Sequence, residues 1–413
     1  IAILCNSLYC CPFYYDDFYG STLLANTKRW WNLRSSVGRK YMLDTFKHTV
    51  DFLSAPTISF SILTVVVPIL FPPTDWFDKI NRKLGFYLLW TKTGCAIAMA
   101  VITVFFAIGY MDDNFSIILM KGDNFPIVLM VYSIFFFTWL GMHKAYINDE
   151  RIEKGLKPSE YNDPDDKVLV WPDLVYIEFI ALILFTVFLT VWSIIVAAPL
   201  EEPANPAATP NPSKAPWYFL GLQEMLVYYD PWIAGILLPM FCIIGLMAIP
   251  YMDINKKGDG YYSFKERRVG IFIFMYGWIV LWLFLIVLGT FFRGPNWNFY
   301  GPFEYWDAHK VVALNNVNLS EYFWVKLLGT GLPDNILLRE AIGFLVVGAY
   351  LFVTPFILAK TWLKDMLEAY GITRFGALMT FGLVMLSLPL KMYFRWIFNL
   401  KYFIAIPEYF FNI

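Results

Sequence analysis

Hydrophobic residues occur along this chain in long runs that are separated by shorter polar segments. A helix needs roughly 20 apolar residues to cross the hydrocarbon core, and it satisfies its own backbone hydrogen bonds there. None of the runs alternates as a membrane β-strand would. The pattern predicts an all-α, polytopic membrane protein with about seven transmembrane helices in a bundle. These helices are expected at about 84–110, 125–147, 174–198, 231–252, 269–292, 340–359 and 375–394.

The distribution of basic residues predicts how the helices are oriented. One set of loops holds 15 Lys or Arg residues and comprises 72–83, 148–171, 253–268 and 360–374. The other set holds 6 and comprises 111–124, 199–230 and 293–339. Basic loops stay on the cytoplasmic side, so the first set is expected on the inner side.

A shorter apolar run at 57–71 has Pro68 inside it and Pro56 and Pro72 at its ends. If this run also spanned the membrane, the six basic residues between Lys28 and Lys47 would lie on the outer side. We therefore expect an interfacial or re-entrant segment there.

Composition narrows the class of protein further. Of the 413 residues, 58% are hydrophobic and 16% are charged, whereas soluble domains carry about 25% charged residues. The net charge of −1 comes without a basic stretch, which excludes a nucleic-acid-binding surface. The five cysteines form no CxxC or CxxCH pattern, so we assign no metal ligands and no covalent haem attachment.

Two motifs resemble a known family. The first is WPDLVYIEFIALIL at 171–184, and the second is the proline-rich EEPANPAATPNPSKAPWYF at 201–219. Together they resemble the C-terminal half of cytochrome b, which is subunit IV in cytochrome b6f-type complexes. The resemblance runs from about Asn162 to Phe292, and FRGPNWNF at 292–299 looks like an extension of it.

The resemblance implies a domain organisation around a subunit IV-like core of three helices at 160–292. An N-terminal region at 1–83 and two additional transmembrane helices at 84–150 precede this core. An outer loop, two further helices and a tail follow it at 293–413.

The resemblance also implies the function. It points to the quinone-site-forming membrane subunit of a quinol-oxidising complex that couples electron transfer to proton translocation, and the chain would be active only with partner chains. The expected partners are a haem-bearing cytochrome b subunit, a Rieske iron–sulfur protein and a c-type cytochrome, in a dimeric complex of a bacterial-type energy-transducing membrane. The partner cytochrome b would hold the b haems and an extra c-type haem, because three histidines are too few for two bis-histidine haems. Menaquinone is favoured, because the variant motif is unlike plant and mitochondrial members.

Residues 216–224 supply the expected quinol site. Pro216, Trp217, Tyr218 and Phe219 would form its walls. The family usually has Pro-Glu-Trp-Tyr where this chain has Ala215-Pro216-Trp217-Tyr218, so the glutamate that accepts protons is missing. We expect Glu224 to replace it. The alternative is that the rings are interfacial anchors and that Glu224 faces headgroups or a neighbouring chain.

Glu178 is a carboxylate about one turn inside a predicted span, where charge is costly and commonly functional. By resemblance, its position faces the extra haem held by the partner, where a carboxylate would ligate the iron or lower its potential. The alternative is a glutamate that reaches the interface or bonds a neighbouring subunit.

Two other functions compete with quinol oxidation. A structural membrane anchor without chemistry would share most of these features. A transporter is disfavoured, because Lys92 and Glu178 lie toward helix ends and the chain shows no internal repeat.

Overall fold

The computed structural model describes residues 42–122, 124–162, 169–196, 203–313 and 315–413. The chain divides into two compact units, residues 1–50 and 51–413. In the first unit, the described residues 42–50 are helical. Most of the expected N-terminal region at 1–83, and the beginning of the proline-rich motif at 201–202, lie outside the described residues.

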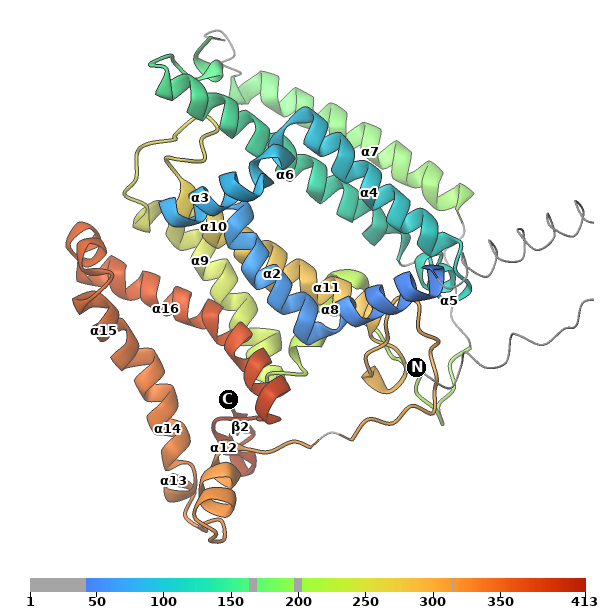
Figure 1. Ribbon diagram of the computed structural model, residues 1–413, viewed down its shortest axis with the longest axis vertical. Coiled ribbons are helices and arrows are strands. Elements are labelled where there is room, and N and C mark those ends of the chain that lie inside the picture. The colour runs from blue at the N-terminus through green and yellow to red at the C-terminus, as the bar shows by residue number, and fades with distance from the viewer. Residues whose placement is uncertain (1–41, 123, 163–168, 197–202, 314) are drawn as a thin grey trace, which may run out of the picture. The chain divides into compact units, whose positions relative to one another are not determined.

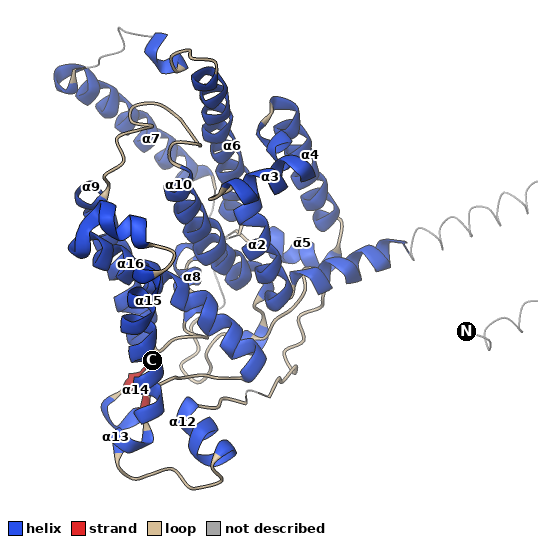
Figure 2. Ribbon diagram, turned by 60° about the vertical axis from the view of Figure 1, so that its left-hand side comes forward, coloured by secondary structure: helices blue, strands red, loops and turns tan. Residues whose placement is uncertain are grey.

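Helices make up most of the described residues of the second unit, and loops make up nearly all of the rest (Figure 2). Seven helical segments of the described chain are long and apolar enough to span a membrane, which confirms the predicted fold class. They are α4 (Lys92–Tyr110), α6 (Phe125–Glu153), η3–α7 (Val170–Ile195), η5–α9 (Ile233–Met252), α10–η7 (Arg268–Phe292), α14–α15 (Ala341–Lys360) and α16 (Lys364–Phe398).

Two helix boundaries differ from the sequence prediction for local reasons. The first span begins at Lys92 rather than at residue 84, because Gly85 has a φ of 76° and ends α3 (Asp75–Leu84). Thr91 then caps α4 by accepting a hydrogen bond of 3.0 Å from the backbone nitrogen of Gly94. The last helix is longer than predicted, and Gly371, with a φ of 73°, breaks its helical geometry near the start.

The core is built around the long span of residues 268–292. This span consists of α10 (Arg268–Met275), η6 (Tyr276–Leu283), α11 (Phe284–Val287) and η7 (Leu288–Phe292). Helix α2 (Pro56–Leu70) packs against it through buried Phe60, whose ring centroid lies 5.5 Å from that of Phe284. At 15 residues, α2 is too short to cross about 30 Å of hydrocarbon by itself. The interfacial or re-entrant placement of α2 stays a prediction.

Helix α8 (Leu220–Met225) lies against the end of the same span (Figure 1). Glycines make this contact close. A Cβ atom added at Gly289 would lie 3.3 Å from the backbone oxygen of Leu220, and one at Gly221 would lie 3.3 Å from a side-chain carbon of Ile286. The proline-rich segment before α8 is thereby held at the end of the bundle.

Short elements complete the described chain. They are η1 (Phe86–Trp90), α5 (Asp113–Leu119), η2 (Ser159–Asn162), η4 (Trp217–Phe219), η8 (Pro295–Trp297), α12 (Leu319–Glu321), η9 (Tyr322–Leu327), α13 (Ile336–Arg339), β1 (Ala405–Ile406), η11 (Pro407–Tyr409) and β2 (Phe411–Asn412). The two strands pair antiparallel, with Ala405 opposite Asn412.

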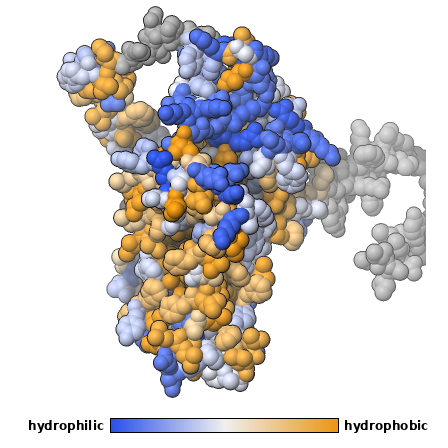
Figure 3. Space-filling view, turned by 90° about the vertical axis from the view of Figure 1, so that its left-hand side faces the viewer, coloured by the Kyte–Doolittle hydropathy of each residue, from blue (hydrophilic) through white to orange (hydrophobic). Residues whose placement is uncertain are grey.

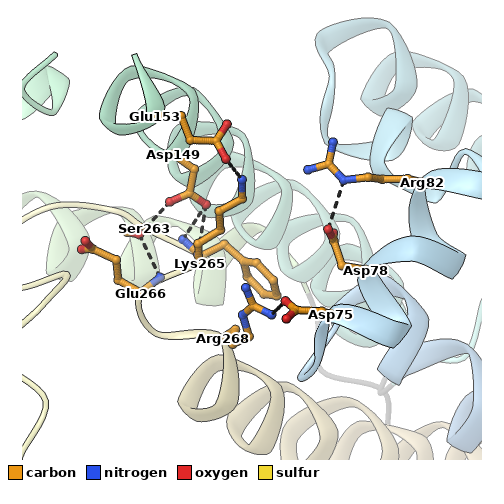
Figure 4. Close-up of polar contacts among 10 residues, drawn as sticks. Asp75, Asp78, Arg82, Asp149, Glu153, Ser263, Lys265, Glu266 and Arg268 are labelled. Atoms are coloured by element: carbon orange, nitrogen blue, oxygen red, sulfur yellow. Dashed lines mark hydrogen bonds and ion pairs between the residues drawn. The ribbon is translucent and has the colours of Figure 1, made fainter. Parts of the chain in front are cut away.

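Polar contacts join three of the four basic loops, at 72–83, 148–171 and 253–268 (Figure 4). The carboxylate of Asp149 on α6 accepts hydrogen bonds from the hydroxyl of Ser263, at 2.7 Å, and from the backbone nitrogen of Lys265, at 3.0 Å. Arg268 at the start of α10 pairs with Asp75 of α3. On the face drawn in Figure 3, hydrophilic residues gather toward the upper part of the view and apolar residues dominate below. This segregation agrees with a bundle that meets water at the upper part of this view.

Candidate functional site

A cavity of about 600 Å³ lies at the other end of the bundle. Three separate parts of the chain line it: residues 114–124, residues 212–220, and the end of the long span with the loop after it, residues 290–306. The walls include Trp217, Tyr218, Tyr305 and Trp306, and we call it the aromatic cavity. Its volume is within the range of about 300–1,000 Å³ that is usual for small-molecule sites.

The structure places three of the four expected wall residues at this cavity. Pro216, Trp217 and Tyr218 line it, whereas Phe219 does not and is 51% exposed. Pro216 precedes the one-turn helix η4, where its fixed φ and missing N–H are tolerated. The rings of Trp217 and Tyr218 meet edge to face, with their centroids 5.7 Å apart.

Gln223 holds the segment before the aromatic residues in place. Its side-chain oxygen accepts a hydrogen bond of 2.8 Å from the backbone nitrogen of Ala215. Its amide nitrogen donates one of 2.9 Å to the backbone oxygen of Ser213. The proline-rich segment supplies few N–H groups of its own, so this one side chain substitutes for the missing backbone pairing.

Glu224 is fully buried and does not line the aromatic cavity. Arg293 donates two hydrogen bonds to its carboxylate, from Nη2 at 2.6 Å and from Nε at 2.9 Å. The indole nitrogen of Trp297 donates a third at 3.0 Å, and the hydroxyl of Tyr228 donates a fourth at 3.2 Å. The carboxylate is therefore enclosed by donors, as a buried ionised group requires.

Burial disfavours the charge of Arg293, but the adjacent Glu224 more than offsets this and holds the pKa of Arg293 above its usual value. Arg293 also donates to the backbone oxygen of Trp297 at 3.0 Å. The pair thus joins α8 to the loop that follows the long span. The FRGPNWNF segment at 292–299 extends the sequence resemblance, but its pattern predicts no role for Arg293 or Trp297.

Lys214 lies in the wall of the aromatic cavity and was also missed. Its Nζ donates a hydrogen bond of 2.8 Å to the backbone oxygen of Thr290 and lies 4.9 Å from the centroid of the Trp306 ring. Burial, assisted by the charges of Lys121 and Arg293 and opposed by that of Glu224, lowers the pKa of Lys214 to about 7. The signal available in the sequence was its position in the proline-rich motif, two residues before the expected wall residue Pro216.

The comparison with known families concerns this same part of the chain. Residues 203–301 match the family model of Cytochrome b(C-terminal)/b6/petD. The match confirms the resemblance found in the sequence and indicates a subunit of a bc/b6f-type complex. It covers 99 of the 413 residues, and no solved structure matches the chain. The WPDLVYI motif at 171–177 lies outside the matched range.

The matched segment, residues 203–301, contains Lys214, the four expected wall residues, Glu224 and Arg293. Glu178, by contrast, lies outside it, on α7 (Val175–Ile195). Glu178 is exposed, and none of the described residues of η3–α7 is buried. The structure does not bring Glu178 to the aromatic cavity.

The described residues do not fit a bis-histidine haem. His143, in the C-terminal half of α6, uses its Nδ1 in a contact of 2.8 Å with the backbone oxygen of Trp90, and its ring stacks on Trp139. His309 is exposed in the loop after the long span. The described residues also contain no group of three His, Cys, Asp or Glu side chains that would hold a metal ion. A quinone ring, in contrast, fits the size and the aromatic walls of the cavity.

Proposed function

We propose that this chain is the quinone-site-forming membrane subunit of a quinol-oxidising complex of the cytochrome bc/b6f type, and that the aromatic cavity is its share of the quinol site. The observation that carries the proposal is that Pro216, Trp217 and Tyr218, which lie in the segment that matches the family, line one cavity of about 600 Å³. A flat ring with two hydroxyl groups needs aromatic walls and polar groups that orient its hydroxyls, and this cavity has both kinds of side chain.

The redox groups belong to partner chains in this proposal. The b haems and the extra c-type haem are assigned to a partner cytochrome b subunit, and the further acceptors are a Rieske iron–sulfur protein and a c-type cytochrome. Menaquinone is the favoured quinone, and protons are released on the outer side of a bacterial-type energy-transducing membrane. This chain's own residues bind and orient the quinol ring and exclude water from it.

Proton acceptance by Glu224 stays a prediction, and in this structure it would require the side chain to move. To accept a proton from quinol, the carboxylate would have to leave Arg293 and reach the cavity, which it does not line. The four hydrogen bonds to Glu224 favour a structural role, in which the ionised side chain fixes α8 against the loop after the long span.

We also propose that α7 faces the haem-bearing partner. Its apolar surface has no buried residue within the described chain, and its Glu178 is a carboxylate that lipid by itself would not stabilise. A carboxylate is a suitable donor to haem iron and lowers the potential of a nearby haem by its charge.

Purification of the native assembly in mild detergent tests the proposed function. We expect the chain to co-elute with a haem b protein and an iron–sulfur protein, and the haem to be reduced when quinol is added. We expect Trp217→Ala to lower the rate of this reduction by at least about tenfold, because stacking against the ring is lost. Phe219→Ala is the matched control, because the ring of Phe219 contacts that of Tyr218 but does not line the cavity.

Isolation of a colourless chain without partners would contradict the proposed function. Co-elution with a haem protein, together with equal rates for Trp217→Ala and Phe219→Ala, would instead favour the structural anchor.

A further inference from the structure

We infer that Lys214 is the residue that accepts the proton from the quinol hydroxyl, in place of the glutamate missing from the motif. This inference rests on the proposed function. It assigns to the aromatic cavity a proton acceptor that neither the sequence motif nor Glu224 provides.

The position of the amine supports this role. Lys214 lines the cavity together with Pro216, Trp217 and Tyr218. The hydrogen bond of Nζ to the backbone oxygen of Thr290 uses only one of its N–H groups, and the contact with the Trp306 ring fixes the amine at the wall. A base must lie within hydrogen-bond reach of the proton it takes, and Lys214 meets this requirement for a ligand in the cavity.

Two more polar atoms lie beside Lys214 in this part of the protein. Thr290 Oγ1 and Trp306 Nε1 are buried and have no hydrogen-bond partner within the described chain. Both residues line the cavity, and both contact Lys214. Buried polar groups are usually paired, so the polar groups around Lys214 are incompletely satisfied.

The surrounding charges favour a neutral amine. Lys121, in the segment between α5 and α6, and Arg293, after the long span, both oppose a positive charge on Lys214, and Glu224 on α8 favours it. Glu304 also lines the cavity, but its carboxylate pairs with Lys310 at 2.7 Å. With a pKa of about 7, a large share of Lys214 is unprotonated at neutral pH, whereas an ordinary lysine would be almost entirely charged.

The proposed step is a single proton transfer. The quinol O–H bond breaks, its electron pair stays on the oxygen, and an N–H bond forms at Nζ, which leaves a quinolate beside an ammonium group. The electrons then leave the quinolate one at a time for the one-electron acceptors of the partner chains that the proposed function names, and the proton of the second hydroxyl group passes to water at the cavity mouth as the quinone forms. The ammonium group returns its proton to water at the cavity mouth.

The test uses the native complex and follows the initial rate of quinol-dependent haem reduction from pH 5.5 to 9. We expect the wild-type rate to rise as the pH passes through about 7, because only the unprotonated amine accepts a proton. Lys214→Met and Lys214→Arg should both lose this rise and lower the rate by about 10² or more, because neither side chain accepts a proton in this range. Haem content and binding of a soluble 1,4-naphthoquinone check that each variant complex is assembled.

Two control variants sharpen the experiment. Lys326→Met removes a positive charge from η9, outside the cavity, and should keep the wild-type rate and pH profile. Lys121→Met removes a charge that lowers the pKa of Lys214, so the rise in rate should move to higher pH.

The experiment distinguishes failure of the Lys214 inference from failure of the proposed function. A wild-type rate without a rise near pH 7, or unchanged profiles in both Lys214 variants, would overturn the role of Lys214 while the proposed function stands. If Glu224→Gln abolished the rise and the Lys214 variants kept it, Glu224 would be the acceptor. A wild-type complex that never reduces haem with quinol would overturn the proposed function and this inference with it.

Discussion

The pair formed by Glu224 and Arg293 illustrates what a single buried charge requires of its surroundings. Glu224 is fully buried, and the side chain of Arg293 is 11% exposed. Two opposite charges removed from water are stable together only when their remaining hydrogen-bonding groups are also satisfied. This requirement is met by hydrogen bonds to the Glu224 carboxylate from Tyr228, Trp297 and the guanidinium of Arg293. Replacing only one of the two charged residues would therefore leave the other charge buried without its partner.

Arg293→Met should therefore lower the free energy of unfolding by about 3–5 kcal/mol, because it leaves the Glu224 carboxylate buried without its partner. Thermal unfolding in detergent measures the effect. Arg82→Met, which breaks an exposed pair with Asp78, is the control and should cost no more than about 1 kcal/mol. A double variant, Glu224→Met with Arg293→Met, should recover part of the loss. Equal stabilities of Arg293→Met and Arg82→Met would show that the buried pair is not structural.

Among the helices, α7 differs from the long span of residues 268–292 in how much of its surface is buried by other parts of the described chain. Of the apolar stretch of each span, 39% of the residues are buried in the long span and 0% in η3–α7. Helices in lipid gain little from burying apolar side chains against one another, so an uncovered helix is stable in the membrane. The exposed Glu178 is the exception on that surface, because a carboxylate needs a polar or charged partner there.

Glu178→Phe should shift the absorption spectrum or the midpoint potential of the extra haem in the purified complex, because it removes a negative charge from the face proposed to meet it. Redox titration with visible spectroscopy measures this shift. Glu178→Gln is the matched control for side-chain size. If Glu178→Phe left both spectrum and potential unchanged, Glu178 would not face the haem.

For the molecule as a whole, the alternation of the spans brings the loops together at two ends. The aromatic cavity lies where residues 114–124, 212–220 and 290–306 meet, and the polar contacts of Asp149 and Arg268 lie where the basic loops meet. Which end faces the cytoplasm is a prediction from the distribution of lysine and arginine.

Labelling of single introduced cysteines tests this orientation. Lys257→Cys, in an exposed part of a basic loop, should react with a membrane-impermeant maleimide in inverted vesicles and not in right-side-out ones. Asn205→Cys, exposed in the proline-rich loop, should show the opposite pattern. Labelling above that of the parent chain is the measure, because the chain has its own cysteines. The reverse pattern would place the aromatic cavity on the inner side.

The sequence by itself determined the membrane class, the seven spans and the segment that forms part of the cavity. These features are local, because the length of an apolar run and the residues of one motif decide them. Three of four wall residues were identified in this way, since Pro216, Trp217 and Tyr218 are neighbours in the chain.

Only the tertiary structure decided what surrounds them. Arg293 is 69 residues from Glu224, and Thr290 is 76 residues from Lys214, so no local pattern connects either pair. Their contacts exist because α8 packs against the end of a span that begins much later in the chain. That packing places Glu224 among donors and Lys214 in the cavity wall, and burial together with neighbouring charges then sets the chemistry of each side chain.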